Sequence, residues 1–432
     1  MDAVRAALDR IAVLDGELGA FATVRREAAL IEASLLAGRW DLARLALAGV
    51  PVAVKDTVPV QGVAPWREPS TPAGADHPLV LRLRAAGAVV VGTTTASDAS
   101  LWPMTDGRDP DGRAVVTRNP WNRSRSPSGS SGGSGAAVAA GLVPVAQGTD
   151  SLGSIRMPAA ACGLVGIKPG AGVVTPVGLG RTDWSGLAAH GSLATTVEDA
   201  ALLLSVLAGR PELARVDEPR SGLRVAVSVR APVTGVRTAA PVVRAVFEVA
   251  GVLGRAGFGV ERAEPRYPRS APLASLARWT NAAAEDLDEV SAARRGDPQR
   301  RTLRHAALGR RLGKWLRPAD VAAWQAAALE FMTGRDLLLL PTTATAPLPA
   351  VEWSRRSWRA NVVASLRYSG GFCAPWNLAG WPAVNVPAGI DPATRTPIGV
   401  QLVGRPGDEG LLIAVAALVE RLRPWPRVYG AR

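Results

Sequence analysis

The stretch that decides the fold is rich in glycine, serine and alanine. It reads SPSGSSGGSGAAVAAG over residues 126–141 and continues, after a few apolar residues, as QGTDSLGSIR over 147–156. The first part predicts a tight turn that opens into a closely packed helix of small side chains, followed by a short strand over 142–146. The second part predicts another loop, and residues 157–161 predict a second small-residue helix with proline near its start. This alternation indicates an α/β fold.

The segments on either side repeat the alternation of strand and helix. An apolar run over 50–56 predicts a buried strand that carries Lys55 at its end. Residues 79–86 predict a helix and residues 88–92 the next strand, whereas residues 1–48 show the helical spacing of apolar side chains. Further along the chain we expect helices over 241–253 and 411–422, mostly helical structure over 270–335, and strands over 223–227, 259–261, 337–340, 383–387 and 398–403.

Composition narrows the class of protein. Arginine and lysine outnumber aspartate and glutamate by 50 to 37, a net charge of +13, but only three of the basic residues are lysines and the arginines are scattered. Such a distribution does not favour a nucleic-acid groove. Two cysteines and three histidines supply neither a disulfide framework nor a histidine-based metal site. We therefore expect no metal, no cofactor and no nucleic-acid partner.

The hydropathy pattern indicates whether the chain crosses a membrane or carries a signal peptide. No apolar run reaches the length of about 18 residues that a membrane-spanning helix needs. The first residues lack the continuous apolar core of a signal peptide. We therefore expect no membrane partner and a cytoplasmic location. Because the sequence shows neither an internal repeat nor a long linker, we expect one domain.

Two local features have the potential for chemistry. Burial at the end of an apolar strand would disfavour the charged form of Lys55 and lower its pKa, so that a neutral amine becomes available as a base. An ordinary ion pair with Asp56 is the alternative. The glycine-serine run is short and leads directly into an apolar helix, which argues against a flexible linker. No lysine follows its glycines, which excludes a P-loop.

Several segments together resemble the amidase signature family of serine hydrolases. They are GVPVAVKD at 49–56, TRNPW at 117–121, GSSGGS at 129–134, GTDSLGSIR at 148–156, CGLVGIKP at 162–169, APWNLAG at 374–380 and GVQLVGRP at 399–406. The resemblance implies a single domain over residues 1–432, with a central mixed β-sheet covered by α-helices. It implies a signature core at about 49–205 and 336–425 and a variable, largely helical region at about 210–335.

The resemblance also implies a Ser-cisSer-Lys triad. On this interpretation Lys55 is the base, Ser130 follows a cis peptide bond and relays the proton, and Ser154 is the nucleophile. The chemistry is coherent, because a serine hydroxyl needs a base within hydrogen-bond reach and this chain has little histidine. The residues implied to bind the oxyanion and the substrate are Ser131, Ser151, Leu152 and Gly153. Asp150 and Arg156 would support the loop, with an ordinary ion pair as the alternative.

The chain departs from the family pattern at position 152 and in the segments 63–68 and 92–98. Leucine stands at position 152, where the family usually has glycine and where a positive φ would be unfavourable for a side chain. We expect ordinary dihedral angles at Leu152, with an altered oxyanion hole as the alternative. The segments that would line an acyl pocket are also unusual. The candidates for lining it are Trp66, Trp102, Met104 and Trp184, with ordinary packing as the alternative for each.

The leading expectation is an amidase that hydrolyses a small linear carboxamide through an acyl-enzyme at Ser154. The same triad would serve an acyltransferase or amide-forming relative. It would also serve the glutaminase component of a tRNA-dependent amidotransferase, which needs a glutamine pocket and a second protein as partner. A catalytically decayed homologue is the non-enzyme alternative. A homodimer, which is common in the family, is a candidate assembly.

Overall fold

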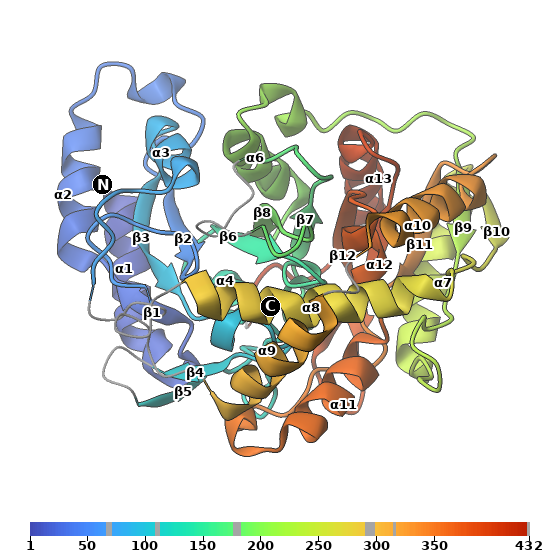
Figure 1. The fold of residues 1–432 in the computed structure, drawn as a ribbon. Helices are drawn as coiled ribbons and strands as arrows, with labels where there is room; N and C mark the ends of the chain where they lie inside the picture. The colour runs from blue at the N-terminus through green and yellow to red at the C-terminus, as the bar shows by residue number, and fades with distance from the viewer. Residues whose placement is uncertain (66–70, 109–112, 176–182, 290–298, 314–316, 430–432) are drawn as a thin grey trace.

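A large mixed sheet forms the centre of the protein. The structure, a computed structural model, describes residues 1–65, 71–108, 113–175, 183–289, 299–313 and 317–429. Eleven strands follow one another across the sheet in the order β1-β3-β2-β6-β8-β7-β12-β13-β11-β9-β10 (Figure 1). The strands are β1 (Phe21–Val24), β2 (Pro51–Lys55), β3 (Val89–Thr94), β6 (Val145–Asp150), β7 (Val165–Lys168), β8 (Ala189–Ala194), β9 (Arg224–Val227), β10 (Gly259–Arg262), β11 (Leu337–Pro341), β12 (Ala383–Ile390) and β13 (Pro397–Val403). A separate hairpin joins β4 (Asp106–Arg108) to β5 (Ala114–Val116).

Both parallel and antiparallel pairs occur in this sheet. Strand β2 runs parallel to β3 and β6, and β9 runs parallel to β10 and β11. The strands between these two groups, from β6 through β8, β7, β12 and β13 to β11, pair antiparallel. The expected strand pair near the C-terminus is therefore present as β12 and β13.

Helices cover both faces of the sheet. The helices are α1 (Asp2–Leu18), α2 (Arg26–Ala37), α3 (Pro78–Ala85), α4 (Gly132–Ala139), α5 (Arg156–Cys162), α6 (Val197–Ala208), α7 (Ala240–Arg255), α8 (Ser270–Glu289), α9 (Arg300–Leu312), α10 (Pro318–Phe331), α11 (Trp358–Ser369), α12 (Ala374–Leu378) and α13 (Glu409–Leu422). One face packs against α1, α2, α4 and α5, and the other against α3, α6, α7 and α13. The expected α/β fold with a central mixed sheet is confirmed.

Strand β2 shows how its sequence contributes to both cores. Val52 and Val54 pack into the core on one face, and Ala53 packs into the core on the other. This follows from the alternation of side chains along a strand. Because all five residues of β2 are buried, the strand carries the amine of Lys55 into the interior at its end.

The glycines of α4 allow this helix to lie unusually close to its neighbours. A Cβ at Gly132 would come within 2.1 Å of Thr105 Oγ1, and one at Gly133 within 2.5 Å of the Ala20 carbonyl oxygen. Neither position has room for a side chain. The expected tight turn and small-residue helix are thus confirmed, and they hold the start of α4 against the end of β3.

Two secondary-structure predictions, one of a strand and one of a helical segment, were wrong in part. The strand expected over 142–146 lies at Val145–Asp150, so that most of it falls within the predicted loop. Residues 1–48 contain the short edge strand β1 as well as helices. The error at β6 has a physical cause: Gln147, Thr149 and Asp150 are buried polar residues whose side chains are hydrogen-bonded, so the strand lacks an apolar pattern.

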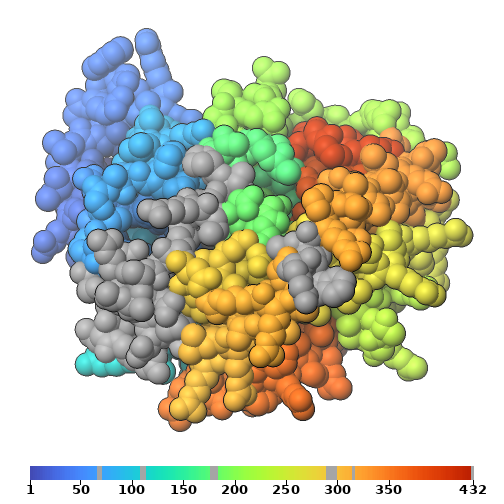
Figure 2. Space-filling model, viewed as in Figure 1, coloured from blue at the N-terminus to red at the C-terminus, as the bar shows by residue number. Residues whose placement is uncertain are grey.

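Helices α8 and α9, from the region expected to be variable and helical, lie across the front of the molecule (Figures 1 and 2). Buried polar contacts attach α9 to the segment before the glycine-serine turn. Arg301 pairs with Asp106, and Thr302 accepts a hydrogen bond from the indole of Trp102 at 3.3 Å. Within the described ranges, no helix has the length and apolarity required to cross a membrane.

Candidate active site

The amine of Lys55 lies in a buried cluster of hydroxyl groups. Lys55 Nζ is 2.7 Å from Ser130 Oγ and 2.6 Å from Thr149 Oγ1. The Gly129–Ser130 peptide bond is cis. The backbone N–H of Lys55 donates to Gln147 Oε1 at 3.1 Å, which ties β2 to β6. The structure thus brings together two residues, Lys55 and Ser130, that are 75 positions apart in the sequence.

Ser154 lies at the wall of a cavity, and its backbone is hydrogen-bonded to the residue that follows Ser130. The backbone N–H of Ser131 donates to the carbonyl oxygen of Ser154 at 3.3 Å, so the two glycine-serine loops are directly hydrogen-bonded. Ser154 lines a cavity of about 340 Å³, while Ser130 and Lys55 are almost completely buried. The arrangement places a hydroxyl at the cavity wall and an amine with a second hydroxyl in the interior.

Burial changes the proton affinity of Lys55. Removal of the amine from water lowers the pKa of Lys55 to about 7, although the negative charges of Asp150 and Asp286 act in the opposite direction. Desolvation disfavours the charged form of a lysine in this way. A substantial fraction of the amines is therefore neutral at neutral pH, and a neutral amine has a lone pair that accepts a proton.

The turn before Ser154 leaves several backbone donors available. Within the described part of the chain, the backbone N–H groups of Ser151, Leu152 and Ser154 form no hydrogen bond. The N–H of Gly153 instead donates to Asp150 Oδ1 at 2.7 Å. The N–H of Ser131 is also occupied, because it binds Ser154, and the Ser131 hydroxyl lies 3.2 Å from the carbonyl oxygen and from the nitrogen of Thr149. Three of the loop's N–H groups are therefore without a partner among the described residues.

Leucine at position 152 is compatible with this turn. Leu152 is not among the non-glycine residues that have a positive φ, as expected. The left-handed value falls on Gly153, with a φ of 122°. A Cβ at Gly153 would also lie 2.8 Å from Cys373 Cβ. The position that requires glycine in this loop is therefore 153, and the Leu152 side chain is free to form part of the cavity wall.

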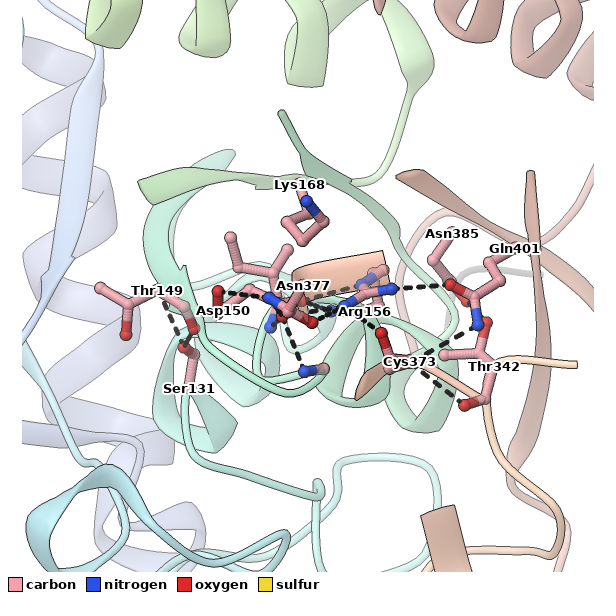
Figure 3. A network of polar contacts seen from close by, with 12 residues as sticks. Ser131, Thr149, Asp150, Arg156, Lys168, Thr342, Cys373, Asn377, Asn385 and Gln401 are labelled. Carbon is pink, nitrogen blue, oxygen red and sulfur yellow. Dashed lines mark hydrogen bonds and ion pairs between the residues drawn. The ribbon is translucent and has the colours of Figure 1, made fainter. Parts of the chain in front are cut away.

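Asp150 and Arg156 form a fully buried ion pair that supports the turn. Arg156 Nε is 2.9 Å from Asp150 Oδ2, and neither side chain is exposed. Arg156 also donates to Gln401 Oε1 and Asn377 Oδ1, and Asn377 Nδ2 donates to the Asp150 carboxylate (Figure 3). Burial alone would raise the pKa of Asp150, but the charges of Arg156 and Lys168 and these hydrogen bonds hold it well below its usual range. The pair is thus part of a network rather than an isolated contact.

Replacing Asp150 by asparagine should strongly destabilise the fold, because it leaves the buried guanidinium of Arg156 without its counter-charge. The expected decrease in the free energy of unfolding is about 3–5 kcal/mol, measured by guanidinium denaturation. Asp9→Asn is the matched control, since Asp9 pairs with Arg26 on the surface, where both side chains are about half exposed. This control should change stability little. Equal effects of the two substitutions would contradict a supporting role for the buried pair.

Sequence reasoning missed several residues of this network. Thr149 contacts the lysine amine, and Asn377 and Gln401 bind the ion pair. Asn377 and Gln401 lie within the two C-terminal segments that carry the family resemblance, so those motifs contained the signal. Thr149 also lies within such a segment, at 148–156, but nothing in a strand sequence indicates which buried hydroxyl faces an amine from another strand.

Part of the predicted acyl pocket lies at the cavity. Trp102 and Trp184 line it, whereas Met104 is buried in the core and is not among the described lining residues. Trp66 lies outside the described residues. Other wall residues come from the variable region, including Tyr267, Leu276 and Trp279, and these were not predicted. The described residues contain no group of three or more His, Cys, Asp or Glu side chains that is placed to hold a metal ion.

Known proteins resemble this chain over nearly its whole length. The model of the family described as "Amidase" matches residues 2–413. A protein of Mycobacterium tuberculosis (strain ATCC 25618 / H37Rv) named "Putative amidase AmiB2" is 36% identical over 442 residues, which cover 97% of this chain and 91% of that protein. One component of the glutamyl-tRNA(Gln) amidotransferase of Carboxydothermus hydrogenoformans is 33% identical over 474 residues, which cover 98% and 93% of the two chains.

Solved structures have the same fold. The structure of 6-aminohexanoate cyclic dimer hydrolase matches with a TM-score of 0.85 and 29% sequence identity, over 98% of this chain and 93% of that one. Together with the relatives, this similarity extends over nearly the whole length of the protein. It therefore includes the strands and loops that hold Lys55, Ser130 and Ser154.

Proposed function

Since the chain belongs to the amidase (amidase signature) family of enzymes, we propose that it hydrolyses an uncharged carboxamide through an acyl-enzyme at Ser154. The observation that carries this proposal is the distance of 2.7 Å between Lys55 Nζ and Ser130 Oγ, next to the loop that presents Ser154 to the cavity. A serine hydroxyl becomes an effective nucleophile only when a base within hydrogen-bond reach takes its proton.

Acylation begins with two proton transfers. Neutral Lys55 donates an N–H to Thr149 Oγ1, which leaves its lone pair for the proton of Ser130. Ser130 in turn takes the proton of Ser154 as Ser154 Oγ forms a bond to the substrate's carbonyl carbon. The carbonyl oxygen becomes an oxyanion, which accepts hydrogen bonds from the free N–H groups of the turn. A donor of this kind contributes about 10²–10³ to the rate.

The remaining steps complete a hydrolysis. The protonated lysine returns its proton through Ser130 to the nitrogen of the leaving group, the C–N bond breaks, and ammonia or an amine departs. Water then attacks the ester on Ser154, with the same relay taking up its proton. The C–O bond to Ser154 breaks, Ser154 regains its proton, and the carboxylic acid leaves. An amine in place of water would give acyl transfer instead.

The cavity wall favours uncharged, largely apolar substrates. None of the described residues that line it carries a charged side chain, and many are aromatic or aliphatic, such as Trp102, Leu152, Met157, Leu276 and Trp279. A buried substrate charge without a partner is strongly unfavourable. Free glutamine has an ammonium and a carboxylate group, so the wall disfavours the glutaminase alternative, although an amidotransferase component is among the relatives.

A panel of amides tests this function. We expect release of ammonia or amine from neutral primary, anilide and cyclic amides, with kcat/KM at least about 100-fold higher than for L-glutamine, the ratio that an unpaired buried charge of about 3 kcal/mol implies. Hydroxylamine added to the reaction distinguishes transfer from hydrolysis, since it traps the acyl group as a hydroxamate. Preferred turnover of glutamine would contradict the proposed substrate class.

A further inference from the structure

Building on the proposed function, we propose that Trp184 is a specificity residue, whose indole N–H donates a hydrogen bond to an acceptor in the substrate. The substrate class that this implies is an uncharged amide with an apolar body and a second acceptor, such as a ketone or another amide carbonyl. The acceptor belongs to the part of the substrate that fills the cavity, away from the carbonyl that Ser154 attacks.

The indole of Trp184 differs from the other tryptophans at the cavity. Trp102, Trp184 and Trp279 all line the wall. The N–H of Trp102 donates to Thr302 Oγ1 at 3.3 Å, and that of Trp279 donates to the Leu101 carbonyl at 3.1 Å. Trp184 Nε1 is buried and has no acceptor within the described part of the chain. Of the three indole donors at this wall, only that of Trp184 is thus left for another group to bind; the Ser100 hydroxyl, which also lines the cavity, has no partner among the described residues either.

A buried donor without an acceptor lowers the stability of a fold. Native proteins retain such groups chiefly where water or a ligand supplies the missing partner. Trp184 is only 2% exposed, and its side chain lies at the wall of a cavity large enough for a ligand. The other polar side chains of the described wall are hydroxyl groups, such as Thr234 and Ser275, and the thiol of Cys373, so the indole N–H of Trp184 adds a donor of fixed direction that can orient a substrate.

The backbone conformation around Trp184 is a second observation that favours a role in ligand binding. Trp184 and Ser185 have φ values of 57° and 55°, in the left-handed region that side chains other than glycine rarely adopt. The turn is nevertheless well held, because the Leu187 N–H donates to the Trp184 carbonyl and Ser185 Oγ donates to Glu285 on α8. Unfavourable dihedral angles that surrounding contacts maintain are typical of ligand-binding positions.

Nuclear magnetic resonance observes this hydrogen bond directly. The Ser154→Ala variant, labelled with ¹⁵N-tryptophan, is titrated with heptanamide and with 4-, 5- and 6-oxoheptanamide, and Trp184→Phe assigns the indole signal. For at least one oxo compound, we expect the Trp184 indole proton to move downfield relative to its position with heptanamide. The indole signals of Trp102 and Trp279, whose donors are already occupied, serve as internal controls and should not show this difference.

Kinetics of the enzyme with Ser154 intact give a second readout. We expect kcat/KM for the best oxo amide to exceed that for heptanamide by about 3- to 10-fold, the range of one neutral hydrogen bond. Trp184→Phe should reduce this ratio to about one, whereas Trp279→Phe should preserve it even if both rates fall. If Trp184→Phe does not fold, benzothienylalanine at position 184 removes the N–H and keeps the ring shape.

The outcomes separate this inference from the proposed function. Binding of the oxo amides without a shift of the Trp184 signal, or a rate ratio that survives loss of the N–H, would overturn the role of Trp184 while leaving amide hydrolysis intact. A shift on binding without any turnover by the wild type would support Trp184 and overturn the proposed function. Failure of all four amides to bind would overturn both.

Discussion

Replacing Ser154 by alanine is expected to lower kcat for every amide substrate by about 10⁵–10⁶-fold, the effect of removing the nucleophile of a serine hydrolase. The physical reason is that no acyl-enzyme forms without the hydroxyl oxygen. The residual rate would come from substrate binding and from the N–H groups of the oxyanion turn. The measurement is steady-state release of ammonia or amine, with thermal melting to show that the variant is folded.

Ser205→Ala is the matched control for this substitution. Ser205 is also buried, but it lies on α6, where its hydroxyl donates to the carbonyl of Leu202. The control should retain wild-type turnover. If Ser154→Ala were to keep more than a few per cent of the activity while Ser205→Ala behaved as wild type, the nucleophile would have to be another group.

Replacing Lys55 by methionine is expected to lower kcat/KM by about 10²–10⁴-fold, the typical contribution of a positioned general base. Methionine keeps most of the aliphatic volume of the side chain but cannot accept the proton of Ser130. Because the amine is buried beside two hydroxyl groups, its removal would leave both Ser130 and Thr149 without their contact to Lys55. The measurement is the full pH profile of kcat/KM for wild type and variant.

The sign of the pH dependence follows from the role of Lys55. Burial lowers the pKa of Lys55 to about 7, and only the neutral amine accepts a proton. Activity should therefore be low in acid, rise as pH passes through about 7, and level off in mild alkali. In Lys55→Met this rise should disappear, since the group that titrates is gone.

A second buried lysine provides the control for this experiment. Burial and the positive charge of Arg156 lower the pKa of Lys168 to about 7 as well, but its amine donates to the carbonyl of Pro169 rather than to the relay. Lys168→Met should keep the alkaline rise of the profile. If the rise vanished in Lys168→Met and persisted in Lys55→Met, the titrating group would be Lys168, which would contradict the proposed mechanism.

Motifs and local patterns predicted the strand before Lys55 and the glycine-serine turn. The apolar run before Lys55 predicted a strand that delivers a buried amine, and the strand is β2. The glycine-serine run predicted a close-packed turn, which the lack of space at Gly132 and Gly133 explains. These features depend on short-range constraints, namely side-chain alternation and the size of glycine, and such constraints are visible in a single sequence.

Other features depend on contacts between distant segments. Strand β6 was misplaced because Gln147, Thr149 and Asp150 are polar yet buried, and their partners come from β2, the turn and α12. The cavity wall was incompletely predicted for a similar reason. An aromatic side chain on α8, such as Trp279, has the same sequence signal whether it faces a cavity or a core.

The central claim is that neutral Lys55 activates Ser154 through Ser130. The most direct test of this claim is covalent labelling by a fluorophosphonate, in which the labelled residue and the labelling rate are both measured. Peptide mass spectrometry should find the phosphonyl group on Ser154 and not on Ser130, and the labelling rate should rise with pH through about 7 in the wild type. In Lys55→Met the same serine should react much more slowly, without that rise. Labelling at another residue, or equal rates in wild type and Lys55→Met, would contradict the claim.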